Sequence, residues 1–208
     1  KKYLKKDLKI LEIGAGSAFF ANKIIKKYPS TDYTIVDPSI RKKLNNKNLT
    51  IINELFPEKI DLKKKYDLVI IFNCLEHIYD VSKTIKHLNK SLNIDGSILV
   101  EVPDVNFQIK KADFNMFTFE HYNYFNLHSL NQMFKKENLK MINYKSYNDT
   151  LFCVFKKSKL KGKLTYPKIF DLRNYKKKLV KLKKIFDIFL DKNINFGIHG
   201  ANFGAFNI

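Results

Sequence analysis

Cysteine is scarce in this chain: only Cys74 and Cys153 occur, and neither belongs to a Cys-x-x-Cys pair. A disulfide framework or a metal centre is therefore not expected, and we predict a reducing, cytoplasmic compartment. Runs of about 18 apolar residues are also absent, so no membrane span is expected. The amino terminus, Lys-Lys-Tyr-Leu-Lys-Lys, lacks the apolar core of a signal peptide. It also lacks an initiator methionine, so we expect the chain to begin inside a longer sequence.

Acidic residues are few beside basic ones, at 20 Asp and Glu against 39 Lys and Arg, and the net charge is +19. Residues 156–192 hold 14 of the basic residues and only three aspartates. Runs of like charge are usually solvated faces, so this excess by itself is a weak sign of a nucleic-acid partner. We therefore disfavour nucleic acid as a partner.

Apolar segments of strand length alternate with segments of helical periodicity along most of the chain. This alternation predicts an α/β fold with a right-handed, doubly wound sheet. Two further strands joined by Asn148-Asp149 predict a closing antiparallel hairpin. The predicted strands are 8–13, 33–36, 49–52, 67–72, 97–102 (after a turn at Asp95-Gly96), 141–147 and 151–156. The predicted helices are 18–28 (with Phe19, Ile24 and Ile25 on its inner side), 81–92, 127–137 and a short turn at 39–44, while 104–126 shows little periodicity.

The carboxyl-terminal part has a different character. Residues 159–167 predict a basic linker, after which apolar residues recur every three or four positions. This spacing predicts a long amphipathic helix, and a homodimer through that helix is one hypothesis. A strand at 195–199 then leads into a glycine turn at 200–204, which indicates the start of a second, truncated α/β unit. We predict two parts, 1–158 and 159–208. The apolar positions of the helix are Leu172, Tyr175, Leu179, Leu182, Phe186 and Phe189.

A glycine turn follows the first predicted strand in Leu11-Glu12-Ile13-Gly14-Ala15-Gly16, and Asp37 closes the next strand. This arrangement is how an α/β protein cradles a nucleoside. The glycines let the backbone approach the ligand, and the acid accepts hydrogen bonds from two ribose hydroxyls. The alternatives are an ordinary tight turn and an aspartate that caps the following helix, because Pro38 suits a first helical position.

Glu12-Ile-Gly-Ala-Gly resembles motif I of class I S-adenosylmethionine (SAM) methyltransferases. The resemblance implies a Rossmann-like methyltransferase sheet with SAM as cofactor. Ala18 stands where the family often has a third glycine, and we expect the loop to keep its form. The cofactor-binding residues implied here are Glu12, Gly14, Gly16 and Asp37, with Glu54 and Leu55 at the adenine.

Asn73-Cys74-Leu75-Glu76-His77 resembles the Leu-Glu-His segment that many small-molecule methyltransferases carry under the methionine part of the cofactor. It implies that Asn73 and Leu75 bind SAM. We expect His77 in the substrate pocket, where the alternatives are a catalytic role and a histidine that fixes the loop. Adenine-modifying nucleic-acid methyltransferases carry an Asn/Asp-Pro-Pro-aromatic motif at this place, which stacks the flipped base. The absence of that motif disfavours a nucleic-acid substrate.

Phe119-Glu120-His121-Tyr122-Asn123-Tyr124-Phe125 resembles the Glu-His-x-x-Tyr-Phe segment of sugar C-methyltransferases, which act on nucleotide-linked keto-sugars. By this resemblance His121 is the general base, and Glu120 orients it or relays its proton. We expect Tyr122 and Tyr124 to form the lid and wall of the substrate pocket. The alternative for Glu120-His121 is a polar pair that anchors an aromatic loop. An imidazole pKa near 6.5 suits proton abstraction at neutral pH. Thr118 stands where that family often has tyrosine, which tilts the prediction toward an oxygen acceptor. Residues 196–204 resemble the start of the same family's carboxyl-terminal domain.

These features together predict an enzyme, a SAM-dependent methyltransferase. The expected acceptor is a small nucleotide-linked or surface-polysaccharide precursor, methylated on oxygen or carbon with His121 as base. One alternative is an RNA or protein methyltransferase guided by the basic tail. Another is a non-catalytic SAM-binding subunit.

Overall fold

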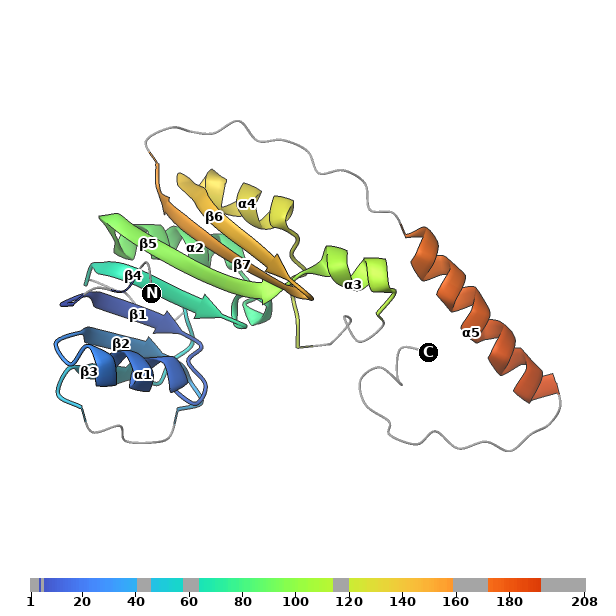
Figure 1. Cartoon of the computed structure of the whole chain (residues 1–208), viewed down its shortest axis with the longest axis horizontal. Helices are drawn as coiled ribbons and strands as arrows, with labels where there is room; N and C mark the ends of the chain where they lie inside the picture. The colour runs from blue at the N-terminus through green and yellow to red at the C-terminus, as the bar shows by residue number, and fades with distance from the viewer. Residues whose placement is uncertain are drawn as a thin grey trace.

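A single seven-stranded sheet organises the chain, in a computed structural model that describes residues 4, 6–40, 46–57, 64–113, 120–158 and 172–191. The strand order is β3-β2-β1-β4-β5-β7-β6 (Figure 1). All neighbours pair parallel except those of β7, which runs antiparallel to both β5 and β6. The predicted doubly wound sheet with a closing hairpin is confirmed. The strands are β1 (Lys9–Ile13), β2 (Asp32–Val36), β3 (Leu49–Ile52), β4 (Tyr66–Phe72), β5 (Leu92–Pro103), β6 (Leu139–Tyr147) and β7 (Thr150–Lys157).

Helices cover both faces of the sheet (Figure 1). Helix α1 (Phe19–Lys27) packs on one face, whereas α2 (Val81–Ser91) and α4 (Leu127–Lys136) pack on the other. Successive side chains of a strand point to opposite faces, so Ile10 joins the core under α1 and Leu11 joins the core under α2 and α4. The unbroken apolar runs of β1 and β4 follow from this two-sided burial.

The phase of α1 differs from the prediction at one position. Ala21, Ile24 and Ile25 are buried, but Phe19 is 55% exposed. Residues 21, 24 and 25 lie on one helical face, and Phe19 is two positions before that face begins, so its side chain points outward. The neighbouring Phe20 instead packs edge-on against Phe72 of β4, with 5.1 Å between ring centroids.

Two further predictions need correction. The expected turn at Asp95-Gly96 lies inside β5, which begins directly after α2 and absorbs the extra residues as a register shift opposite Tyr66 and Leu68. The irregular stretch after β5 contains a short helix, α3 (Val105–Lys111). Its start is fixed by Asp104, whose carboxylate accepts a hydrogen bond from the backbone N–H of Asn106.

Some predicted segments fall on residues that the structure does not describe. These are most of the turn at 39–44, the linker at 159–167, the strand at 195–199 and the glycine turn at 200–204. The second predicted part, 159–208, is therefore described only in its long helix, α5 (Arg173–Asp191).

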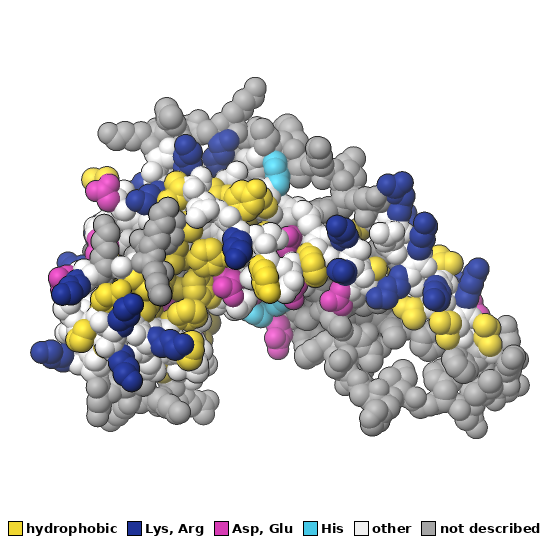
Figure 2. Space-filling model, viewed as in Figure 1, with side chains coloured by type: hydrophobic (Ala, Val, Ile, Leu, Met, Phe, Trp, Pro, Cys, Tyr) yellow, Lys and Arg dark blue, Asp and Glu magenta, His cyan; other side chains and the backbone are white. Residues whose placement is uncertain are grey.

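Helix α5 packs beside α3, and the Lys178 ammonium donates a hydrogen bond to the carbonyl of Ala112 at 2.6 Å. Figure 2 shows lysines and apolar side chains exposed along this helix. Leu179 and Ile188 are among its exposed apolar residues. The homodimer through this helix stays a prediction. Within the described ranges, no helix is long and apolar enough to cross a membrane.

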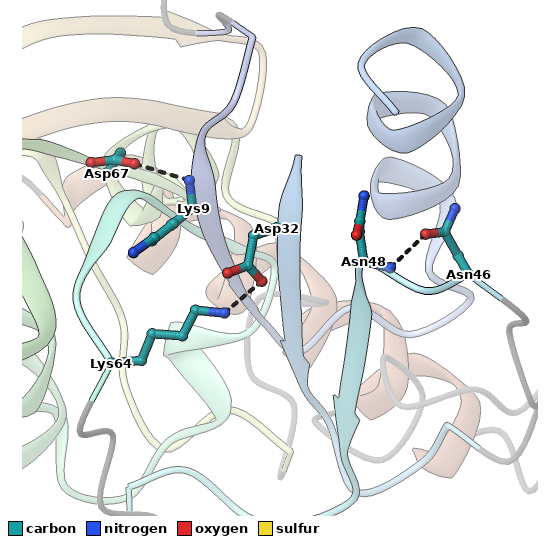
Figure 3. Close-up of polar contacts among 6 residues, drawn as sticks. All are labelled: Lys9, Asp32, Asn46, Asn48, Lys64 and Asp67. Atoms are coloured by element: carbon teal, nitrogen blue, oxygen red, sulfur yellow. Dashed lines mark hydrogen bonds and ion pairs between the residues drawn. The ribbon is translucent and has the colours of Figure 1, made fainter. Parts of the chain in front are cut away.

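Polar contacts tie the starts of the strands together (Figure 3). The backbone N–H of Lys9 on β1 donates to the Asp67 carboxylate of β4 at 2.9 Å. The Lys64 ammonium pairs with Asp32 at the start of β2, and the Asn48 N–H donates to the Asn46 side chain just before β3. Ligands of doubly wound sheets bind at the opposite, carboxyl ends of the parallel strands.

Candidate functional site

A cavity of about 370 Å³ lies over the carboxyl ends of β1, β2, β3 and β4. This volume is in the range of small-molecule sites, and the place is where doubly wound sheets bind their ligands. A larger hollow of about 640 Å³ lies between α4 and β6, at the far edge of the sheet and away from the glycine turn. The smaller cavity is lined by Ile13, Gly14, Gly16, Val36, Asp37, Pro38, Ser39, Glu54, Leu55, Phe56, Asn73, Cys74, His77 and Ile78.

The glycine turn forms the floor of this cavity. Gly14 has φ +70°, and a Cβ at this position would lie 2.4 Å from the Sγ of Cys74. Its N–H donates to the carbonyl of Val36 at 3.0 Å, which holds the turn against β2. Ala18, which replaces the family's third glycine, adopts φ 56° and starts α1. The loop therefore has the expected form with alanine in a left-handed conformation.

Asp37 is buried at the cavity wall and ties two segments together. Its Oδ2 accepts the Gly16 N–H at 2.7 Å, and its Oδ1 accepts the N–H and the hydroxyl of Ser39 at 2.7 and 2.6 Å. The two contacts with Ser39 form a turn there, whereas most of the helical turn that Asp37 was expected to cap lies outside the described residues. Each carboxylate oxygen accepts about two hydrogen bonds, so Oδ2 retains capacity for a ribose hydroxyl. Glu54 and Leu55 line the same cavity, as predicted.

The end of β4 supplies the opposite wall. Asn73 has φ 47° and lines the cavity; its N–H and its amide donate to the carbonyl and the side chain of Glu101, at 2.9 and 3.0 Å. The next residue, Cys74, was not predicted as a site residue. Burial raises the pKa of its thiol to about 12, so the side chain is a neutral wall and not a nucleophile.

Two predicted cofactor residues lie elsewhere. Leu75 is fully buried in the hydrophobic core and does not line the cavity. Glu12 is buried on the α1 face of β1, where it accepts a hydrogen bond from the Tyr33 hydroxyl at 2.8 Å. Burial raises the pKa of Glu12 to about 7, although the Tyr33 hydrogen bond lowers it and the charge of Asp37 raises it further. Glu12 thus holds β1 to β2 just before the glycine turn, and Leu75 belongs to the core on the other face of the sheet.

Only some of the residues predicted to contact the substrate lie close together. The rings of His77 and His121 pack edge to face with centroids 4.7 Å apart, and Tyr124 lies 6.2 Å from His121. Burial lowers the pKa of His121, as does the charge of His77, whereas Glu120 raises it. Tyr122 is 63% exposed, packs against Tyr79 and does not line the cavity.

Glu120 has a different contact from the one expected. Among the described residues its carboxylate forms no hydrogen bond with His121. Its backbone carbonyl instead lies 2.9 Å from Nδ1 of His77. A carbonyl only accepts, so Nδ1 of His77 is the donor, and in the neutral ring Nε2 carries the lone pair.

Sequence reasoning missed the role of Glu76, although it noted the Leu-Glu-His segment. This side chain is only 2% exposed, and within the described part of the chain its Oε2 has no hydrogen-bond partner. Burial raises the pKa of Glu76. The Glu76 carbonyl accepts the N–H groups of Tyr122 and Asn123 at 3.0 and 3.1 Å, which docks the loop carrying His121. No short-range pattern marks this contact.

Comparison with known proteins now decides the family. A model of the methyltransferase domain matches residues 1–144. The chain belongs to the methyltransferase domain family. Its sheet is the Rossmann-like fold of class I methyltransferases, and the cofactor of this domain is SAM.

The individual curated relatives match a smaller part of the chain than the family model does. Malonyl-[acyl-carrier protein] O-methyltransferase 1 from Ilyobacter polytropus is 33% identical over 101 residues, which is 45% of this chain and 37% of that protein. The plantazolicin methyltransferase BpumL, solved with SAH, has a TM-score of 0.60 at 16% identity, over 74% of this chain and 77% of the other. CalO1, a methyltransferase in calicheamicin biosynthesis also solved with SAH, has a TM-score of 0.58 at 16% identity, over 74% and 50%. The sugar C-methyltransferase family is not singled out by these matches.

Proposed function

We propose that this chain transfers the methyl group of SAM to a small acceptor that must lose a proton, a hydroxyl or a carbon acid. The observation that carries the proposal is a pair of imidazoles beside the cofactor cavity. His77 lines the cavity, and the ring of His121, which is not part of the cavity lining, packs edge to face against the ring of His77. Membership of the domain family identifies SAM as the methyl donor. The histidines provide groups that can accept the acceptor's proton.

The reaction is an in-line displacement. The acceptor's electron pair forms the bond to the methyl carbon while the S–CH₃ pair returns to sulfur, which leaves neutral S-adenosylhomocysteine. Alignment of the two reactants lowers the barrier by about 7 kcal/mol at best. The acceptor's proton goes to the imidazole of His121 in the direct route that the sequence predicts. A positioned base of this kind contributes roughly 10²–10⁴-fold.

The histidine pair also bears on the class of acceptor. A carboxylate, as the name of the malonyl-[acyl-carrier protein] relatives indicates for them, is already ionised at neutral pH and needs no base. A sugar hydroxyl or a carbon beside a ketone does need one. A nucleotide-linked sugar is therefore the first candidate acceptor, and the resemblance of the Glu120-His121 segment to sugar C-methyltransferases supports it. The malonyl thioester is the second candidate, because the curated relatives are named for it.

The test replaces His121 by alanine and measures release of S-adenosylhomocysteine with nucleotide-linked sugars and with malonyl-carrier protein. We expect turnover to fall by roughly 10²–10⁴-fold with the sugar panel, while calorimetry finds SAM affinity within about twofold of the unaltered protein. His87→Ala, on α2 and outside the cluster, serves as the matched control. Unchanged turnover in His121→Ala, or activity confined to the malonyl thioester, would contradict the proposal.

A further inference from the structure

We propose that Glu76, His77 and His121 form a binding site for a divalent cation beside the cofactor cavity. One ligand atom from each side chain lies within 4.8 Å of the others. The inference rests on the proposed function, because it names a second route by which the same histidines promote loss of the acceptor's proton. The sequence predicts no metal centre because neither cysteine belongs to a Cys-x-x-Cys pair, and the 44-residue separation of His77 and His121 conceals their proximity.

Glu76 supplies the first observation. Its side chain is only 2% exposed, and in the described ranges its Oε2 has no hydrogen-bond donor. A buried carboxylate oxygen without a partner is costly, and a cation satisfies it directly. The Glu76 carbonyl also holds the N–H groups of Tyr122 and Asn123. The main chain therefore keeps the Glu76-His77 segment and the His121 segment side by side without any cation.

His77 supplies a second, independent observation. Its Nδ1–H donates to the Glu120 carbonyl at 2.9 Å, which leaves Nε2 as the ring nitrogen that can bind a ligand. Histidines that bind metals usually donate their other ring N–H to a carbonyl or carboxylate, because this fixes both the tautomer and the ring orientation. The ring that lines the cavity is held by the same kind of contact.

The donor set selects the class of cation. One carboxylate and two imidazoles suit Mn²⁺, Fe²⁺, Co²⁺ or Zn²⁺, whereas Mg²⁺ and Ca²⁺ prefer oxygen ligands alone. Three protein ligands leave open positions for solvent and for an acceptor oxygen. A cation held by Glu76, His77 and His121 would promote loss of the acceptor hydroxyl's proton to water; the acceptor's electron pair would then form the bond to the methyl carbon as the S–CH₃ pair returns to sulfur.

The binding test uses Mn²⁺ as the probe on protein stripped with a chelator. Calorimetry on the unaltered protein should find one site, and Glu76→Gln and His121→Ala should each weaken it at least about 10-fold. His87→Ala, whose ring contacts Phe56 and the Lys83 carbonyl, should bind Mn²⁺ normally. Each variant is also titrated with SAM, so that a misfolded protein is recognised. Absence of Mn²⁺ binding, or binding that both variants retain, overturns the cation site.

Methyl transfer is measured separately on stripped and Mn²⁺-reloaded protein. We expect at least about a 10-fold loss on stripping, restored by Mn²⁺. Full turnover in stripped protein that binds no Mn²⁺ overturns the cation site and leaves direct transfer to His121 standing. Mn²⁺ binding that depends on Glu76, without turnover of any acceptor, supports the cation site and overturns the proposed function instead.

Discussion

On the cofactor side of the cavity, the walls are main-chain turns at the ends of β1, β2 and β4, and Gly14, Asp37 and Asn73 are fixed by backbone geometry. On the acceptor side, main-chain hydrogen bonds from the Glu76 carbonyl dock the loop that carries His121, and the rings of His77 and His121 then meet edge to face. The turns of the first side each follow a strand that the local sequence marks, whereas the second side is a loop docked on a distant segment without such a mark. We expect the cofactor side to respond sharply to small changes in backbone space and the acceptor side to respond to side-chain chemistry.

Gly14→Ala should cause the largest loss of SAM affinity among the cofactor-side variants. The new Cβ would lie 2.4 and 2.6 Å from Sγ and Cβ of Cys74, at φ +70°. Left-handed strain of about 1–2 kcal/mol adds to an overpacking cost of about 1–3 kcal/mol. We expect calorimetry to show a loss of SAM affinity of about 100-fold or more.

Gly16→Ala is the matched control, because φ is +52° but nothing lies within 4 Å of the added Cβ. It carries the strain of the turn without the clash, so its loss of affinity should be roughly a tenth as large. Equal losses in the two variants would show that the approach of Cys74 does not matter.

Glu12→Gln tests the contact that holds β1 to β2 just before the glycine turn. Burial raises the pKa of Glu12 to about 7 in the folded protein, against 4.5 for the ordinary side chain. The folded state therefore binds this proton more tightly, and its stability contribution is lost as pH rises from 4.5 to 7. The loss is on the order of 3 kcal/mol. The free energy of unfolding, measured with urea between pH 5 and 8, should decrease with pH in the unaltered protein. It should depend less on pH in Glu12→Gln.

Tyr33→Phe provides the opposite change. It removes the hydroxyl whose hydrogen bond lowers the pKa of Glu12. The decline in unfolding free energy should then continue to higher pH. Parallel curves for the unaltered protein and Glu12→Gln would mean that this carboxyl is not the source of the slope.

The fold could be predicted because its signals are local. The apolar run of β4, the helical spacing of Ile85 and Leu88 and the Asn148-Asp149 turn each act within a few residues. The errors arose where tertiary contacts decide. The extra residues before Ser97 form an irregularity between the pairs Tyr66–Leu92 and Leu68–Ser97. A local sequence pattern does not reveal the partner strand that permits this. Helix α3 was missed because seven residues give little periodicity.

The site divides along the same line. Gly14, Gly16, Asp37 and the β3 and β4 ends were predictable because each follows a strand that the apolar pattern already located. Glu12 and Leu75 were assigned to the cofactor by motif alone, yet strand alternation and core burial turn them away from the cavity. The meeting of Glu76, His77 and His121 depends on a loop docked through main-chain hydrogen bonds, which no spacing encodes.

Asp37→Ala has a smaller effect than the clash at Gly14. The change removes the acceptor for the Gly16 N–H and for Ser39, as well as the candidate ribose contact. A hydrogen bond to a charged group contributes about 1.5–3 kcal/mol, so SAM affinity should fall by roughly 10- to 100-fold. Ser39→Ala keeps the backbone donor and should lose only a few-fold. Normal calorimetric affinity of Asp37→Ala would remove this residue from the cofactor site.

Tyr122→Ala is the smallest expected change and sharpens the acceptor side. The Tyr122 ring is 63% exposed and packs edge-on against Tyr79, with centroids 5.7 Å apart. Such an exposed pair contributes about 0.5–1 kcal/mol at most, and the N–H that anchors the loop is kept. We expect KM for the acceptor to change by about two- to threefold with kcat unaltered, and Tyr79→Ala to behave alike. A loss of kcat comparable to that of His121→Ala, absent from Tyr79→Ala, would place the Tyr122 ring at the reacting atoms and extend the acceptor side beyond the histidine pair.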